Sequence, residues 1–277
     1  MIGPSRSGES LCDVFERLQV QIEEAVSSVG GVLLRGFDVP SVEAFQQFAA
    51  AFGHPLLSYD FGSTPRTALG GGVYTSTEYP AHQHIPLHNE QAYTREWAMK
   101  LWFHCVTAAD SGGETPIADS RAIYREMPEA IRVRFARGIL YVRNYGDFDV
   151  PWQQVFNTED RAEVEAYCHR TGIQWEWKDD GGLRTRQLCQ GIERHLRTGE
   201  TVWFNQGHLF HISNQQPEVR EMLEDLVGIE NLPRNVYYAD GSPIPDTIFD
   251  EIRGVLAEQT VIFPWQAGDA LMLDNML

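Results

Sequence analysis

The sequence predicts an α+β protein with a jelly-roll core of short strands and helical insertions. Two observations lead to this prediction: many short apolar stretches are separated by turn residues at hairpin-like spacing, and stretches of helical periodicity lie between them. A third observation is that no repeat, low-complexity tract or Pro-rich linker divides the 277 residues. We therefore expect residues 1–277 to form a single domain.

The N-terminal part of the chain predicts two helices around one buried strand. Apolar residues recur at helical spacing over residues 10–29, and Gly30 and Gly31 follow as a stop signal. Residues 32–34 form a short apolar run typical of a buried strand. Ser41 is suited to cap a second helix. The buried side of that helix is predicted to consist of Phe45, Phe48, Ala49 and Phe52.

The rest of the chain alternates between short strands and helices. Residues 99–106 alternate apolar and polar side chains, which predicts a strand, and a turn at 110–113 leads to another short strand at 114–118. Two short helices follow, the second opened by Pro128. Further strands are predicted at residues 139–143, 173–177, 183–187, 201–204, 261–263 and 270–273. Further helices are predicted at about 159–170, 217–227 and 246–259.

The composition excludes several classes of function. The 22 Lys and Arg residues against 39 Asp and Glu give a net charge of −17, which argues against a nucleic-acid or anionic membrane surface. The four cysteines lie far apart without Cys-x-x-Cys spacing, which is typical of a reducing, cytoplasmic environment and predicts no disulfide framework. The first residues lack the apolar core of a signal peptide, and no apolar run approaches the roughly 18 residues of a membrane span. We expect a soluble protein that binds a small molecule or another protein.

The stretch 85–93, Ile-Pro-Leu-His-Asn-Glu-Gln-Ala-Tyr, has the strongest chemical signal. At the start of a strand, His88 and Glu90 would share one face while Asn89 points away. An imidazole and a carboxylate are two of the three ligands of a 2-His-1-carboxylate site, which holds Fe(II) and leaves its other positions open. A lone His-x-Glu also arises by chance on exposed strand ends. The Gly-, Ser-, Thr- and Pro-containing stretch 61–83 before it is either a lid over the site or an ordinary surface connection.

Several blocks of sequence occur in the order that is typical of one known family. They are the residues 86–93, 100–106, 112–120, 204–211, 264–269 and 273–275. With these blocks the chain resembles the taurine dioxygenase and dichlorophenoxyacetate dioxygenase (TauD/TfdA-like) superfamily from about residue 31 to 277. It is most similar to the branch that hydroxylates amino acids in nonribosomal peptide biosynthesis. The resemblance implies a double-stranded β-helix of the clavaminate-synthase-like type, with Fe(II) and 2-oxoglutarate as cofactors.

The resemblance also implies roles for individual residues. His88 and Glu90 match the first two iron ligands, and Thr115 matches the position whose hydroxyl contacts a carboxylate of 2-oxoglutarate. A neutral hydroxyl can bind a carboxylate without competing for the iron. The alternative interpretation of Thr115 is a β-branched strand residue. In the family the distal His ligand and the Arg for the far carboxylate of 2-oxoglutarate follow the Asp-Asn pair, so we expect both after Leu277.

Other histidines offer alternative metal ligands. His82, His84 and His88 could in principle hold zinc, although they give no closed set of four ligands. His208 and His211 are spaced i, i+3 and could ligate a metal on a helical turn. Histidines so placed are more often packing residues with satisfied hydrogen bonds.

The predicted function is that of an Fe(II)- and 2-oxoglutarate-dependent dioxygenase. It would hydroxylate an unactivated C–H bond of an amino acid, or of an aminoacyl group on a peptidyl carrier protein, in natural-product biosynthesis. The resemblance makes Glu90 an argument for hydroxylation, because related halogenases lack that carboxylate. An acidic carrier would need a basic landing site, and the arginines at 121, 125, 132, 134 and 137 form the best one, unless they are only a solvated face. The alternatives are a dioxygenase of another small organic acid, of the taurine or aryloxyalkanoate type, and a non-catalytic binding relative or fragment.

Overall fold

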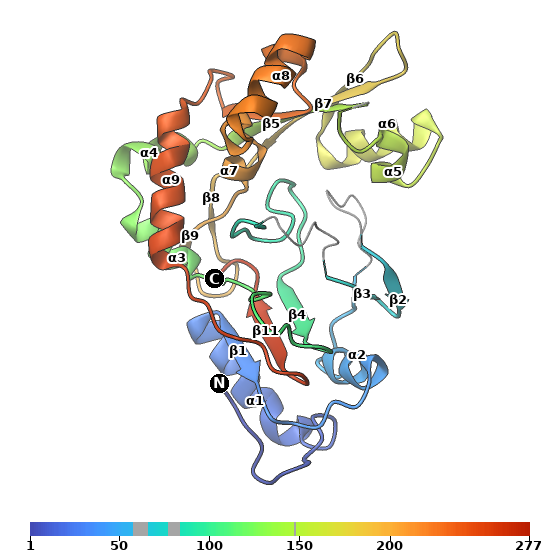
Figure 1. Ribbon diagram of the computed structural model, residues 1–277, viewed down its shortest axis with the longest axis vertical. Helices are drawn as coiled ribbons and strands as arrows, with labels where there is room; N and C mark the ends of the chain where they lie inside the picture. The colour runs from blue at the N-terminus through green and yellow to red at the C-terminus, as the bar shows by residue number, and fades with distance from the viewer. Residues whose placement is uncertain (58–65, 77–83, 147) are drawn as a thin grey trace.

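The structure is a computed structural model that describes residues 1–57, 66–76, 84–146 and 148–277. Its helices and antiparallel sheets confirm the predicted α+β class, whereas the jelly-roll core and the single domain stay predictions. The N-terminal helices and one sheet lie at one end of the molecule, and a second sheet with its helices lies at the other end (Figure 1). None of the helices in the described ranges is long and apolar enough to cross a bilayer.

The first sheet joins the two ends of the chain. Its antiparallel strands lie in the order β1 (Gly31–Leu34), β11 (Ala270–Asp274) and β4 (Lys100–His104). Helices α1 (Phe15–Val29) and α2 (Val42–Ala50) pack against it and bury a shared apolar cluster. Both helices, the stop at Gly30 and the cap at Ser41 are confirmed, but α1 begins at Phe15 and not at residue 10, and Phe52 is buried just beyond the end of α2. The Gly30 amide bonds the Val26 carbonyl at the end of α1, and Ser41 Oγ accepts from the Ala44 amide at 3.2 Å.

The second sheet forms the other end of the molecule. Its strands lie in the order β10 (Arg234–Tyr238), β5 (Ile139–Tyr145), β7 (Leu183–Cys189) and β6 (Gln174–Trp177). Helices α3 (Ser120–Glu126), α4 (Glu129–Phe135) and α9 (Asp246–Gln259) bury their apolar side chains in one cluster with residues of β5 and β10. The remaining elements are α5 (Trp152–Phe156), α6 (Arg161–Thr171), α7 (Gly207–Phe210), α8 (Pro217–Val227), β2 (Ala68–Gly70), β3 (Val73–Tyr74), β8 (Ile192–Arg194), β9 (Thr201–Trp203) and short 3-10 helices at Ile212–Asn214 and Ile229–Asn231.

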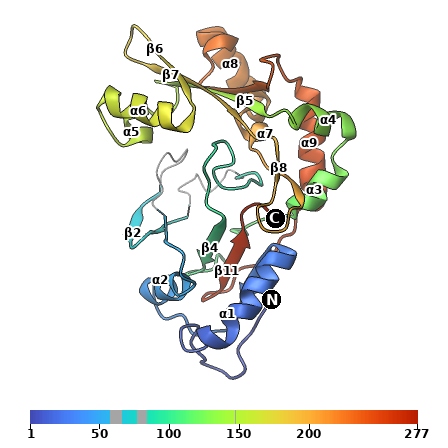
Figure 2. The ribbon, with the colours of Figure 1, turned by 180° about the vertical axis from the view of Figure 1, so that it is seen from behind.

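The last described residues lie between the two sheets. Figures 1 and 2 place the end of β11 and Leu277 beside α3, and the Ser120 amide donates to the Leu277 carbonyl at 2.7 Å. Met276 and Leu277 are buried in a small cluster with Ala92 and Phe204. This packing brings the C-terminal segment next to the stretch that contains His88.

The structure corrects two expectations of regular structure. The strands predicted at 114–118 and 261–263 reduce to one isolated pair, Ile117 with Val261. The strand predicted at His88 is absent from the described residues, because 84–89 have no regular structure and a turn follows from Glu90. Gln91 has a φ of 56°, which a strand does not tolerate. Most of the stretch 61–83, the predicted lid or connection, lies outside the described residues.

Replacing Gly138 by alanine is expected to destabilise the protein by about 2 kcal/mol or more. Gly138 has a φ of +90°, and an added Cβ would lie 2.6 Å from the Cys189 carbonyl oxygen on the neighbouring strand β7. Gly241 is the matched control, because its φ is +80° but nothing lies within 4 Å of an added Cβ. Urea denaturation of both variants measures the difference. An equal loss of unfolding free energy in both variants would mean that β7 shifts to accommodate the added Cβ at little cost.

Candidate active site

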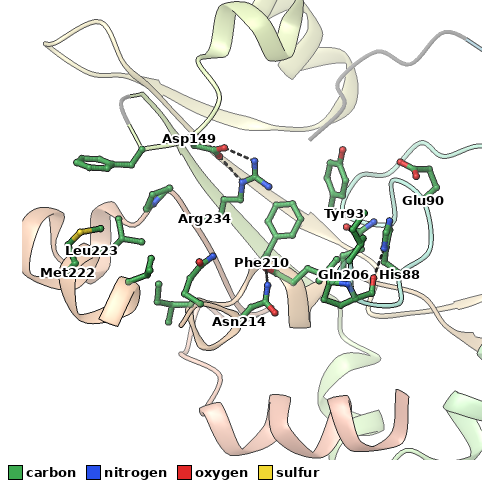
Figure 3. A pocket seen from close by; sticks show the side chains of 18 of the residues that line it. His88, Glu90, Tyr93, Asp149, Gln206, Phe210, Asn214, Met222, Leu223 and Arg234 are labelled. Carbon is green, nitrogen blue, oxygen red and sulfur yellow. Dashed lines mark hydrogen bonds and ion pairs between the residues drawn. The ribbon is translucent and has the colours of Figure 1, made fainter. Parts of the chain in front are cut away.

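A pocket of about 480 Å³ lies between the segment that contains His88 and one end of the second sheet (Figure 3). Its polar residues include His88 and Glu90 at one end and Asp149 and Arg234 farther along the wall. The apolar lining residues are Ile85, Phe148, Leu209, Phe210, Ile212, Val219, Met222 and Leu223. A concave, mostly apolar site with a few polar groups is typical of small-molecule binding.

The backbone fixes the orientation of the His88 ring. His88 Nδ1 lies 2.7 Å from the Pro86 carbonyl oxygen. A carbonyl only accepts hydrogen bonds, so Nδ1 is the donor, and in the neutral ring Nε2 then has the free lone pair. Metal-binding histidines are usually oriented by such a bond from the ring nitrogen that does not bind the metal. His88 is therefore prepared to offer Nε2 as a ligand.

Glu90 lines the same end of the pocket as His88. Its Oε2 accepts from Arg66 Nη2 at 2.9 Å, and both side chains are mostly shielded from solvent. The structure thus places the two residues together, as the sequence predicted, although through a turn and not through the alternation of a strand. The side chain of Asn89, between them, points away and donates to the Asn275 carbonyl at 2.6 Å.

Asn275 holds the backbone of Glu90 from the C-terminal segment. Its Oδ1 accepts from the Glu90 amide at 2.8 Å, and its Nδ2 donates to the carbonyls of Glu90 at 2.9 Å and Ala98 at 2.8 Å. Asn275 is 3% exposed, so these bonds are shielded from water. The Asp-Asn pair is the sequence signal that could have identified this residue.

Two further side chains hold the preceding backbone. The side-chain Nε2 of Gln206 donates to the Asn89 carbonyl at 2.6 Å. The backbone N–H of Gln206 donates to the Tyr141 hydroxyl at 2.8 Å. His208 Nε2 donates to the Leu87 carbonyl at 2.9 Å. Residues 87–90 are thus held by side chains from distant parts of the chain, which explains why they do not need a strand partner. Sequence reasoning gave no role to Gln206.

The alternative metal ligands do not assemble in the described residues. His208 and His211 are buried but do not line the pocket, and burial lowers the pKa of each to about 4. His211 fits the packing interpretation, because its Nδ1 bonds Ser213, whereas the buried Nδ1 of His208 has no hydrogen-bond partner among the described residues. His84 is exposed, and His82 lies outside the described residues. Within the described ranges no three His, Cys, Asp or Glu side chains lie close enough together to hold a metal ion.

The buried His208 is expected to make stability depend on pH. Because burial lowers its pKa to about 4, the unfolded chain binds more protons than the folded chain between pH 4 and about 6.5. The free energy of unfolding should therefore fall as the pH falls through this window, by about 1.4 kcal/mol per pH unit from this group. Urea titrations at several pH values measure the slope. His208→Gln should remove this part of the slope, whereas the same change at the exposed His54 should leave it.

Thr115 lies apart from this pocket. Its hydroxyl accepts from Trp265 Nε1 at 3.0 Å, and it is not among the residues that line the pocket with His88 and Glu90. Its role as a contact of 2-oxoglutarate stays a prediction.

The segment 121–137, with its five arginines, contains fewer accessible cations than the sequence suggested. Arg121 is 9% exposed and is paired with Asp119 and Glu200. Arg134 bonds Asp240 and Ser242. Arg121 is a structural ion-pair residue, which corrects the expectation that it contributes to a landing site for a carrier protein.

Comparisons with known proteins agree with the predicted family. The family model for the "Taurine catabolism dioxygenase TauD, TfdA family" matches residues 3–277. The dapdiamide synthesis protein DdaC of Enterobacter agglomerans is 42% identical over 279 residues, which cover 100% of this chain and 84% of DdaC. A clavaminate synthase-like protein of Arabidopsis thaliana is 35% identical over 270 residues, which cover 92% of this chain and 77% of that protein.

Solved structures agree in fold. PvcB of Pseudomonas aeruginosa superposes with a TM-score of 0.56 at 16% identity, over 99% of this chain and 76% of PvcB. A taurine dioxygenase of Burkholderia xenovorans superposes with a TM-score of 0.53 at 17% identity, over 93% of this chain and 70% of that one. The match of the family model over nearly the whole chain, together with the two relatives above 30% identity, shows that the protein is an oxygenase of the TauD, TfdA dioxygenase family.

Proposed function

We propose that this oxygenase hydroxylates an unactivated C–H bond of an amino acid or an aminoacyl group in natural-product biosynthesis. Members of the family use Fe(II) and 2-oxoglutarate. The observation that carries the proposal is the pairing of His88, with its Nε2 lone pair, and Glu90 at one end of a pocket of about 480 Å³. We also propose that the two larger sheets belong to the double-stranded β-helix of this family.

The donor atoms fit the metal in part. A neutral imidazole nitrogen and a carboxylate are two of the three ligands that non-haem Fe(II) takes in oxygenases. When bound, Fe(II) with 2-oxoglutarate supplies the activation of dioxygen that is needed to insert one oxygen atom into a C–H bond. The bonds between Asn275 and the Glu90 backbone hold the C-terminal segment against these two donors.

The residues of the chain contribute orientation and exclusion of water. The bond from His88 Nδ1 to Pro86 and the bonds from Asn275 to Glu90 fix the two ligands before any metal is bound. Arg66 pairs with Glu90 and so orients that carboxylate. The apolar side chains at the other end of the pocket can position an aliphatic group, which decides the site of attack.

The similarity to the dapdiamide synthesis protein DdaC supports a role in natural-product biosynthesis. A second candidate is oxidation of another small organic acid, and the description of the matching family as taurine catabolism dioxygenases favours it. Both candidates need the same pair of ligands and differ only in the substrate.

Succinate formation tests the proposal directly. The full-length protein is incubated with Fe(II), 2-oxoglutarate and dioxygen, and free amino acids, carrier-loaded amino acids, taurine and aryloxyalkanoates are compared. We expect an amino acid or its carrier-bound form to stimulate succinate formation and to gain the mass of one oxygen atom. Stimulation by taurine or an aryloxyalkanoate alone would assign the second candidate. No succinate with any substrate, despite bound metal, would support a binding relative without turnover.

A further inference from the structure

A second and smaller cavity of about 20 Å³ adjoins the main pocket and shares Tyr93 and Phe210 with it. Apart from Tyr93, its polar residues come from one face of the second sheet. They are Tyr141, Arg143 and Tyr145 of β5 with Thr185 and Gln187 of β7. The cavity has room for one or two oxygen atoms, which is the size of a small polar group and not of a whole ligand.

Among the described residues, Arg143 is the one cation that lines this cavity. The residue is 4% exposed, and its guanidinium lies 4.5 Å from the centre of the Tyr145 ring. Its Nη2 contacts Asp149 Oδ2 at 3.3 Å, whereas Nε and Nη1 have no hydrogen-bond partner in the described protein. A buried charged group with unpaired donors is costly, so the site is incomplete without a group that accepts hydrogen bonds.

The neighbouring arginine does not relieve this shortage. Arg234 of β10 lies directly opposite Arg143, and like charges at opposed positions of a sheet repel. Asp149 contacts both, but its close contacts are with Arg234 Nε at 2.8 Å and Nη2 at 2.5 Å. The carboxylate of Asp149 is therefore used mainly by Arg234, and Arg143 has only the longer contact.

A hydroxyl group adds a donor to the same cavity. The Tyr141 hydroxyl oxygen accepts from the backbone N–H of Gln206, so the hydroxyl can still donate its own proton to another group. Burial raises the pKa of Tyr141, so the hydroxyl stays protonated at neutral pH. Donors from two residues of one strand thus face a cavity that is open to a small acceptor.

We propose that Arg143 binds the carboxylate of the substrate, with the attached carbon chain in the apolar part of the main pocket. A carboxylate suits the site, because it offers oxygen acceptors and a negative charge in a small volume. Figure 3 shows the Asp149–Arg234 pair and Phe210 on the wall between the apolar residues Met222 and Leu223 and the pair His88 and Glu90. The substrate class is then a carboxylic acid with an aliphatic chain. The inference rests on the proposed function only in naming this ligand as the substrate.

Binding of hexanoate and of hexanamide to the full-length protein tests the inference without turnover. The two probes differ only in the charged end, and isothermal titration calorimetry measures their affinities. We expect hexanoate to bind about tenfold or more tightly than hexanamide. In Arg143→Met this preference should vanish, whereas Arg134→Met, a change at a more exposed arginine outside both cavities, should preserve it. Arg143→Lys keeps the buried charge and should show a reduced preference if the methionine variant does not fold.

Equal affinities for the acid and the amide in the wild-type protein would overturn the inference and leave the cavity as a site for water only. A second arm repeats the titration with saturating 2-oxoglutarate. Unchanged binding of hexanoate supports the substrate site, whereas mutual exclusion would assign Arg143 to the cosubstrate and overturn the inference. Selective hexanoate binding in a protein that oxidises no substrate would reject the proposed function alone.

Discussion

Replacing His88 by alanine is expected to abolish the absorption band of the complex with Fe(II) and 2-oxoglutarate and to lower succinate formation by more than about 100-fold. Loss of a residue that only hydrogen-bonds to a metal ligand already costs about 10–100-fold in affinity or activity, and loss of the ligand itself costs more. The variant leaves Glu90 as the remaining member of the proposed pair of ligands. Anaerobic titration followed by absorption measures binding, and a succinate assay measures turnover.

His84→Ala is the matched control for this variant. His84 belongs to the same segment but is exposed and does not line the pocket. Both signals should be unchanged in it. If His84→Ala removed the metal as well, a centre built from the histidines before residue 90 would replace the assignment of the 2-His-1-carboxylate site. Full activity in His88→Ala would remove His88 from the metal site.

The sequence was most informative where local pattern alone decides structure. Helices α8 and α9 begin and end at the predicted residues, because an opening proline or acidic residue and a regular apolar stripe define both. The first and last residues of β5, β6 and β7 differ from the predicted ones by no more than two residues. The strand predicted at residues 114–118 does not form, because only Ile117 pairs with another backbone segment. That pairing depends on the position of residue 261 in space, which the local pattern of residues 114–118 does not encode.

The candidate site was predicted in its chemistry but not in its geometry. The pattern His-x-Glu identified His88 and Glu90, yet the turn that brings them together depends on bonds from Gln206 and Asn275. Such contacts, more than 100 residues apart in sequence, leave no local pattern. Arg143 was missed for a similar reason, because a polar residue within a predicted strand gains its meaning only from the register of β5 with β7 and β10.

Replacing Asn275 by alanine is expected to lower the free energy of unfolding by about 3 kcal/mol or more. The change removes the partner of the Glu90 amide and of the carbonyls of Glu90 and Ala98, and an unsatisfied buried polar group costs about 1–3 kcal/mol. Because Glu90 is a ligand in the proposed site, its looser backbone should also weaken metal binding by about 10–100-fold. Urea denaturation followed by circular dichroism measures the first effect, and titration with Mn(II) measures the second.

Two variants separate the loss of the bonds between Asn275 and the backbone of Glu90 and Ala98 from a general effect of removing an asparagine. Asn231→Ala deletes one exposed bond, from Nδ2 to the Val227 carbonyl at 3.1 Å, and should change stability by no more than about 0.5 kcal/mol. Asn275→Asp keeps an acceptor for the Glu90 amide but turns a carboxylate oxygen toward the carbonyls of Glu90 and Ala98, so it should destabilise despite its nearly identical shape. Since the repulsion arises only if these contacts exist, an Asn275→Asp protein as stable as the wild type would show that Asn275 does not hold the Glu90 backbone.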